Sequence, residues 1–334
     1  MNAAWYEKQG PARQVLVVGT LPDPEPESGE VRIRVAASGI NPGDVKKRQN
    51  AFGYGMPFPR VIPHSDGAGT IDRIGQGVAR PRIGERVWCY GAQSHRAFGT
   101  AAEYVVVPSS QAVPLPDGVP FEQGACLGIP GITAHRAVHA AGPVAGRTLL
   151  VQGGAGAVGV CAVGLARLAG ARVLATVRSG ADAALARAAG AHGVVQYGGC
   201  SRDELIRDMR ALAPGGMDHV VEVAFGANIE ADCEVLANDG SIAAYATETA
   251  TPAIPFWPLV FKNVRIFFLG SDDFPQAAKA AAAESINAML AGGWPGFRID
   301  KRVSLANIAE AHEYLEQRHG NGRAVVITAG SQSP

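Results

Sequence analysis

The residues with the clearest chemical meaning form a glycine-rich turn between a short apolar segment and an amphipathic one. Thr148–Gln152 is strand-like, and a helical pattern covers Ala157–Ala169. Between them, Gly154, Gly156 and Gly159 have the G-x-G-x-x-G spacing, which allows a tight turn, close approach of the backbone to a pyrophosphate, and close helix–strand packing. The N–H groups and dipole at the helix start favour the phosphates of a dinucleotide. The cofactor-binding residues predicted from this turn are Gly153, Gly154, Ala155, Gly156, Ala157, Val158 and Gly159.

The end of the next strand indicates which dinucleotide the turn would bind. In proteins that bind NAD, an Asp or Glu about 20 residues after the turn accepts hydrogen bonds from the adenosine ribose. The predicted strand Arg172–Val177 continues instead into Arg178 and Ser179. Arg178 has a planar, permanently charged guanidinium suited to a phosphate, and Ser179 adds a hydroxyl donor. NADPH is therefore the expected cofactor; the alternative is that Arg178 is a solvated charge at a strand end.

Length, charge and composition exclude several classes of protein. A chain of 334 residues is expected to form two domains. Its 30 basic and 30 acidic side chains cancel, which argues against a nucleic-acid or acidic-membrane partner. No run of about 18 uncharged apolar residues occurs, and Met1–Gly10 lacks a signal-peptide pattern, so a cytoplasmic protein is expected. Five scattered cysteines without a C-x-x-C pair favour reduced, packed thiols.

The pattern of apolar residues changes at about Phe121. Before it, strands are expected at 14–18, 31–36, 86–90 and 100–107, with long loops over 41–63. After it, strands and helices alternate, which is typical of a parallel sheet with right-handed crossovers. The expected strands are 148–152, 172–177, 194–197, 219–224, 240–246 and 264–269, and the expected helices are 157–169, 181–189, 202–213 and 229–236. Helices at 276–290 and 305–318 and a strand at 324–328 follow.

The strand Val264–Leu269 is very apolar. An exposed apolar edge strand needs a cover, and the same edge of a second subunit would supply one. A homodimer that pairs through this strand is therefore expected.

Separated motifs, taken in their order along the chain, carry a family resemblance. Ser38–Asp44 is followed by Ile62–Gly69, then by Gly124–Ala134, the glycine turn, and finally Gly322–Val325. In this order they resemble the medium-chain dehydrogenases/reductases, and within them the zinc-independent quinone oxidoreductase (zeta-crystallin-like) branch. None of these motifs alone would be specific.

The resemblance implies an α/β fold with two domains. A GroES-like, mostly-β domain would comprise residues 1–122 and 271–334. A Rossmann NADPH-binding domain, with a doubly wound parallel sheet, would comprise residues 123–270. The partners implied are small molecules.

The resemblance also raises the question of zinc. Zinc-dependent members of the family place a Cys, a His and a second Cys around the metal, and the matching residues here are Asn41, Ser65 and Ile129. An amide, a hydroxyl and an alkyl group cannot replace two thiolates and an imidazole. His64 lies one residue from the His position, and in an extended segment its side chain would point to the other face. No metal is therefore expected.

Without zinc to polarise a carbonyl, the resemblance implies an acceptor that needs less help. Hydride transfer from NADPH to a quinone is the expected reaction, because the product anion is delocalised and hydrogen-bond donors can stabilise it. The alternatives are reduction of the carbon–carbon double bond of an alkenal or enone, and a protein that binds NADPH without catalysis.

The resemblance assigns Asn41, Asp44, Tyr54 and Thr133 to positions near the nicotinamide, as catalytic candidates. For Asn41 and Asp44 the alternative is capping of a turn, and for Thr133 it is a helix-start hydroxyl. For Tyr54, or its neighbour Phe52, the alternative is local packing.

Further cofactor contacts are implied outside the turn. They are expected from Arg178, Ser179, Tyr197, Gly226, Ala246, Thr247, Leu269, Gly270 and Arg323. Arg323 could instead be a solvated charge at a strand end. His95, in a polar loop, could bind substrate or be a surface residue; both interpretations stay open.

Overall fold

The computed structural model describes residues 1–317 and 322–328, which form two compact units. One unit comprises Met1–Ile129 with the described residues of Gly296–Pro334, and the other comprises Pro130–Pro295. The predicted boundaries lay after residues 122 and 270. The largest difference concerns the segment 271–295, which groups with the second unit.

Helix α10 (Gln276–Ala291) accounts for that difference because it packs on helix α5 (Ala157–Leu168) of the second unit. A Cβ built on Gly164 of α5 would lie only 2.6 Å from Sδ of Met289. The glycine therefore permits the close approach of the two helices.

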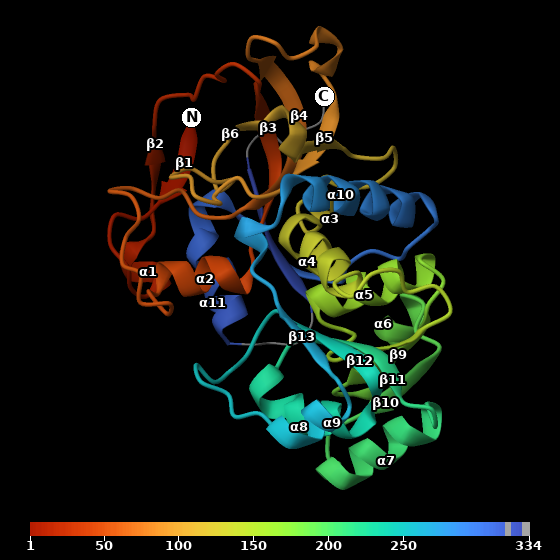
Figure 1. Ribbon diagram of the computed structural model, residues 1–334. Helices are drawn as coiled ribbons and strands as arrows, with labels where there is room; N and C mark the ends of the chain where they lie inside the picture. The colour runs from red at the N-terminus through yellow and green to blue at the C-terminus, as the bar shows by residue number, and fades with distance from the viewer. Residues whose placement is uncertain (318–321, 329–334) are drawn as a thin grey trace. The chain divides into compact units, whose positions relative to one another are not determined.

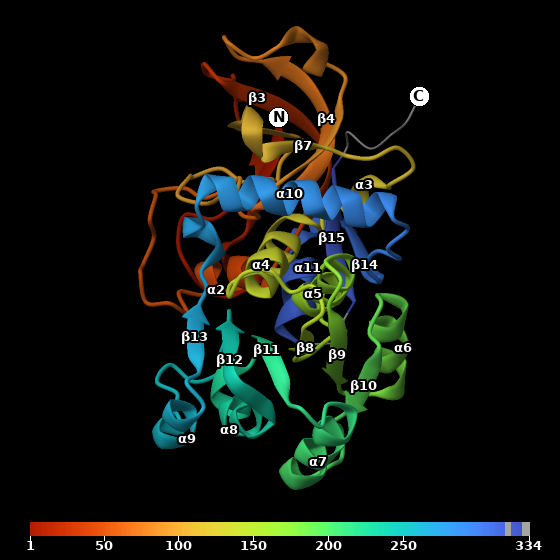
Figure 2. The same ribbon diagram turned by 45° about the vertical axis from the view of Figure 1, so that its right-hand side comes forward.

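A six-stranded parallel sheet forms the centre of the second unit, in the order β10-β9-β8-β11-β12-β13 (Figure 2). Its strands are β8 (Thr148–Val151), β9 (Arg172–Val177), β10 (Gly193–Gln196), β11 (Met217–Glu222), β12 (Leu236–Ala244) and β13 (Arg265–Phe268). The helices of this part, besides α5 and α10, are α4 (Gly128–Val138), α6 (Gly180–Ala188), α7 (Arg202–Leu212), α8 (Phe225–Val235) and α9 (Phe256–Phe261). From β8 the chain moves outward to β10 and then returns to the other side of β8 with β11. This is the doubly wound Rossmann order, and it confirms the predicted fold class.

The core of the second unit explains why its strands read as continuous apolar runs. Leu150, Leu174, Val220 and Ile242 lie buried on four adjacent strands, in one cluster with Met209 of α7. Helices cover a parallel sheet on both faces, so neither face of a strand needs polar residues.

The first unit is built around a seven-stranded sheet in the order β14-β15-β3-β4-β5-β7, with β6 also paired to β3. Its strands are β3 (Glu30–Gly39), β4 (Asp66–Ile74), β5 (Arg86–Cys89), β6 (Tyr104–Pro108), β7 (Ala112–Pro114), β14 (Ile299–Ser304) and β15 (Arg323–Ile327), and a separate pair is formed by β1 (Asn2–Trp5) and β2 (Val17–Thr20). The helices are α1 (Ala12–Val15), α2 (Pro42–Arg48), α3 (Phe121–Gly124) and α11 (Ile308–Glu316) (Figure 1). Because β15 pairs antiparallel with β3, residues from both ends of the sequence build this sheet, as the GroES-like resemblance implied.

Two predictions for the first unit were wrong. The expected strand at 14–18 is divided between α1 and β2. The expected loop at 41–63 contains α2, which begins with Pro42 at its first position and has basic residues in its last turn. Glycine and proline suggested a loop there, but proline at the first turn is compatible with a helix because the missing N–H has no intrahelical partner.

Two further expectations concern the state of the cysteines and the presence of membrane-spanning helices. All five cysteines are free, and only Cys200 is partly exposed. Within residues 1–317 and 322–328, no helix has the length and apolar character needed to cross a bilayer.

Candidate functional site

The glycine turn between β8 and α5 leaves no room for side chains on its inner face. Gly153 adopts a φ of +67°, which favours glycine. A Cβ on Gly154 would lie 2.6 Å from Cβ of Ala175 on β9, and a Cβ on Gly159 would press on the Gly153 carbonyl and lie 2.9 Å from Cα of Gly154. The G-x-G-x-x-G spacing therefore packs the turn between the neighbouring strand and the start of the helix.

Hydrogen bonds hold the turn at both ends. The N–H of Gly154 donates to the Thr176 carbonyl (2.8 Å), and that of Gly156 donates to the Gly153 carbonyl (2.9 Å). Gly156 then caps α5 and accepts from the N–H of Val160 (2.8 Å). The N–H groups of the first helical turn precede any intrahelical acceptor, so together with the helix dipole they form an anion site.

The ends of β9 and β10 bring together two of the predicted cofactor-binding residues. The N–H of Tyr197 donates to the Val177 carbonyl (2.9 Å), which places Tyr197 beside the residue that precedes Arg178. Arg178 is exposed, and no hydrogen bond or ion pair involves its guanidinium within the described part of the chain. Its charge is therefore available to a ligand.

Ser179 is engaged differently from the prediction. Its hydroxyl caps α6, accepting from the N–H of Asp182 (3.3 Å) and donating to the Asp182 carboxylate (2.9 Å). The hydroxyl hydrogen is thus already used by a neighbouring acid. Cofactor binding by Ser179 stays a prediction and would require that hydrogen bond to change.

The remaining predicted cofactor residues of the second unit follow the ends of β11, β12 and β13. Phe225 N–H donates to the Ala246 carbonyl (3.1 Å), Gly226 N–H to the Thr247 hydroxyl (3.3 Å), and Leu269 N–H to the Ala244 carbonyl (2.9 Å). Because the strands are parallel, these segments share the carboxyl edge of the sheet with the glycine turn. Gly270 follows directly on Leu269. Ligands of doubly wound sheets bind at this edge, where the strand order reverses.

In the first unit, a buried polar network surrounds Asn41 at the start of α2. Its amide nitrogen donates to the Asp66 carboxylate (2.6 Å), and its amide oxygen accepts from Arg323 (2.9 Å). Asp66 also accepts from the N–H of Ile129 (2.9 Å). All three network side chains, Asn41, Asp66 and Arg323, are buried, so Arg323 is not the solvated strand-end charge of the alternative interpretation.

Asp44 adopts the capping role that the sequence left open. Its carboxylate accepts from the backbone N–H of Asn41 (2.7 Å), which satisfies a donor at the start of α2. The Asn41 side chain, at the N-cap position, also forms hydrogen bonds with Asp66 and Arg323 outside the cap.

Asp66, for which the sequence predicts no role, is fully buried at the first position of β4. Burial raises the pKa of this carboxyl to about 7, with Asp44 adding to the rise, while the hydrogen bonds from Asn41 and Ile129 and the charge of Arg323 oppose it. The signal in the sequence that could have pointed to Asp66 is a single acidic residue followed by the small residues Gly67, Ala68 and Gly69.

His64, next to one of the positions that match the zinc ligands of zinc-dependent family members, has other buried partners. Nδ1 of His64 lies 2.8 Å from the Ser38 hydroxyl oxygen, and its Nε2 lies 3.2 Å from Nε2 of His312. Neither partner is Asn41 or Ser65. Burial lowers the pKa of His64 to about 3. Across residues 1–317 and 322–328, no group of three or more His, Cys, Asp or Glu side chains could hold a metal.

Other predicted residues have varied surroundings. Thr133 lies buried in the middle of α4, which excludes the helix-start alternative. The Tyr54 side chain is 87% exposed and stacks on Phe52 with ring centroids 5.8 Å apart. His95 is exposed and adopts a φ of +56°. Roles of Thr133, Tyr54 and His95 in the reaction stay predictions.

Comparison with known proteins supports this description. Two family models match the chain, an alcohol dehydrogenase GroES-like domain at residues 27–117 and a zinc-binding dehydrogenase at residues 157–283. A quinone oxidoreductase of Mus musculus is 30% identical over 301 residues, which cover 90% of this chain and 88% of the relative.

Solved structures agree with both domains but differ in cofactor. An NAD-dependent alcohol dehydrogenase matches with a TM-score of 0.84 at 28% identity, covering 98% of this chain and 99% of the other. A mycobacterial protein complexed with NADPH matches with a TM-score of 0.83 at 27% identity, covering 98% and 100%. Overall similarity therefore does not decide between the two dinucleotides.

The raised pKa of Asp66 predicts a specific pH dependence of stability. The unfolded chain releases this proton near pH 4, whereas the folded protein holds it to about pH 7. The free energy of unfolding should therefore fall as the pH rises through this window, by a few kcal/mol at about 1.36 kcal/mol per pKa unit. The Asp66→Asn protein should lack this component.

The measurement is chemical denaturation at a series of pH values for the wild type and Asp66→Asn. Asp117→Asn, at an exposed acid of the same unit, is the control and should follow the wild type. Identical pH profiles for the wild type and Asp66→Asn would contradict the prediction.

Proposed function

Because the chain belongs to the medium-chain dehydrogenase/reductase superfamily, we propose that it is a zinc-independent reductase that uses NADPH to reduce a quinone. The observation that carries the proposal is the glycine turn, with the unpaired Arg178 at the tip of the adjacent strand. The quinone oxidoreductase named above supports the substrate class.

Residues of the second unit would bind the cofactor. The turn and the first N–H groups of α5 hold the pyrophosphate, and Arg178 pairs with the phosphate on the adenosine ribose. Ala246, Thr247, Leu269 and Gly270 supply backbone at the same edge of the sheet. When bound, the cofactor supplies a hydride, and correct placement of the acceptor accounts for most of the rate.

The donor set in the first unit supports an acceptor that needs no Lewis acid. Asn41 is held by Asp66 and Arg323, and Ser65 and Ile129 offer no thiolate or imidazole. We retain Asn41, Asp44, Tyr54 and Thr133 as proposed residues near the nicotinamide, with Asp44 acting through the backbone of Asn41.

The choice of acceptor is tested by NADPH oxidation with 1,4-naphthoquinone and with 2-hexenal. We expect consumption with the quinone, unchanged when a metal chelator is added. Reduction of 2-hexenal with little quinone turnover would instead identify an enone reductase. NADPH binding without turnover of either acceptor would identify a non-catalytic protein.

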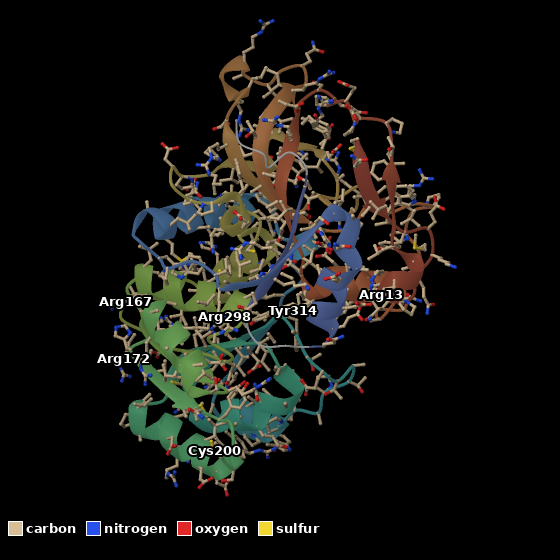
Figure 3. All side chains as sticks on the ribbon, turned by 180° about the vertical axis from the view of Figure 1, so that it is seen from behind. Arg13, Arg167, Arg172, Cys200, Arg298 and Tyr314 are labelled. Atoms are coloured by element: carbon tan, nitrogen blue, oxygen red, sulfur yellow. The ribbon has the colours of Figure 1, made fainter. Side chains whose placement is uncertain are left out.

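The cofactor preference is tested by Arg178→Asp. Loss of a charge-assisted bond to a phosphate, and repulsion by the new carboxylate, should weaken NADPH by roughly tenfold to a hundredfold while NADH changes little. The control is Arg172→Asp, at the opposite end of the same strand and on the outer surface of this unit (Figure 3). Equal losses for both cofactors would rule out the phosphate role.

We also propose that the protein forms a homodimer through β13. This strand is the edge of the six-stranded sheet, and Figure 2 shows α9 next to it. Trp257 and Phe261 of α9 are exposed and stack with ring centroids 5.9 Å apart, and Phe268 of β13 is also exposed. An unpaired strand edge flanked by exposed aromatic rings is a surface that a second copy would cover.

Light scattering coupled to size-exclusion chromatography tests the dimer. The wild type should have twice the chain mass of 34.6 kDa, and Phe268→Asp should shift the population to the monomer. Leu168→Asp, at an exposed apolar residue at the end of α5, should leave the dimer intact. A monomeric wild type would refute the proposal.

A further inference from the structure

Four buried polar side chains lie beneath the glycine turn, and the proposed reaction uses none of them directly. Glu222 ends β11, Asp232 lies on α8, Gln152 follows β8, and Thr176 lies on β9. These three strands are neighbours in the sheet (Figure 2). Glu222 and Asp232 are completely inaccessible to solvent, and Gln152 and Thr176 nearly so.

The side chains form a hydrogen-bonded series that begins at the turn itself. The backbone N–H of Gly153 donates to the Thr176 hydroxyl oxygen (3.2 Å), and that hydroxyl donates to Oε1 of Gln152 (2.5 Å). The Gln152 amide nitrogen donates to Oδ1 of Asp232 (2.7 Å). Each group therefore accepts from one neighbour and donates to the next, which fixes the orientation of the Gln152 amide.

The second oxygen of Asp232 requires a proton. Oδ2 is buried and receives no hydrogen bond from a donor in the described chain. The Asp232 side chain is also within hydrogen-bonding reach of Glu222. The Glu222 carboxylate accepts from the N–H of Ala224 and from the amide nitrogen of Asn228 (3.1 and 3.2 Å). Two buried carboxyls can form a hydrogen bond only when one is protonated, and the donors around Glu222 place the proton on Asp232.

Among the described residues, no basic side chain forms an ion pair with either of these acids. Tyr245, which follows β12, interacts electrostatically with Glu222, and Cys233 on α8 interacts with Asp232. Burial raises the pKa of Tyr245 and of Cys233, so neither adds charge at neutral pH. Burial and the charge of Glu222 also raise the pKa of Asp232 well above its ordinary value.

We propose that Asp232 is a positioning residue of the dinucleotide site, whose protonated carboxyl holds Gln152 and, through Thr176, fixes the N–H of Gly153 and the conformation of the turn. The effect on catalysis rests on the proposed binding of NADPH by this turn. Loss of the proton as the pH rises would leave two buried negative charges next to each other, and the hydrogen bonds from Asp232 to the turn would weaken. Because Asp232 is fully buried and would act only through Gln152 and the turn, the expected consequence is weaker cofactor binding rather than a slower reaction at saturating NADPH.

Two nearly isosteric substitutions separate hydrogen bonding from charge. Asp232→Asn keeps an acceptor for Gln152 and a donor for Glu222 without a titratable proton. It should bind NADPH within about twofold of the wild type at neutral pH, and should not share the wild-type loss of affinity as the pH rises. Asp232→Leu removes both hydrogen bonds. It should weaken NADPH about tenfold and raise KM more than it lowers kcat.

Amide hydrogen exchange of the segment 152–159 without cofactor gives a readout that is independent of binding. Exchange should be faster in Asp232→Leu and unchanged in Asp232→Asn. Thr176→Val removes the hydrogen bonds between Gly153 and Gln152 without changing either carboxyl. It should show the same faster exchange as Asp232→Leu, and it replaces Asp232→Leu in the test if that variant does not fold.

Two outcomes would overturn the positioning role. One is Asp232→Asn and Asp232→Leu being equally impaired in both binding and exchange. The other is Thr176→Val leaving exchange and NADPH affinity unchanged. A wild type that binds neither NADPH nor NADH would refute the proposed function, while the exchange measurements would still report on the positioning of the turn.

Discussion

The close packing of the glycine turn against β9 and the start of α5 is the constraint on which the second unit depends. Gly154 can approach Ala175, and Gly159 can approach Gly153, only because neither glycine has a side chain. This contact sets where α5 begins relative to β8, and so where its free N–H groups point. A bulkier residue would either push the helix away from the sheet or close the space that a phosphate needs.

Polar groups that cannot reach water stabilise the geometry around the predicted site residues in each unit. In the first, Asn41 is fixed between Asp66 and Arg323; in the second, Gly153 is tied to Thr176. A buried polar network restricts the conformation of its members because a side chain that moves away leaves an unsatisfied partner. The energetic cost is visible in the raised pKa values of Asp66 and Asp232.

The sequence was sufficient for the features that depend on local pattern. The Rossmann strands were predicted to within a few residues, because β-α units with apolar strands have a strong periodic signal. The helix at Pro42 was missed because glycine and proline dominate its first turn, and its cap by Asp44 is visible only in three dimensions. The partners of Asp66 and Asp232 lie 25 or more residues away in most cases, and no local spacing links them.

The end of β9 shows how a contact that is visible only in the structure changes the interpretation of a sequence motif. The sequence offered Arg178 and Ser179 as two donors to one phosphate. In the structure, Ser179 caps α6 and donates to Asp182, so a carboxylate lies in the first turn of that helix. That carboxylate stabilises the helix but repels a phosphate nearby. Preference for NADPH must then come mainly from Arg178, whose charge has to outweigh Asp182 as well as bind the ligand.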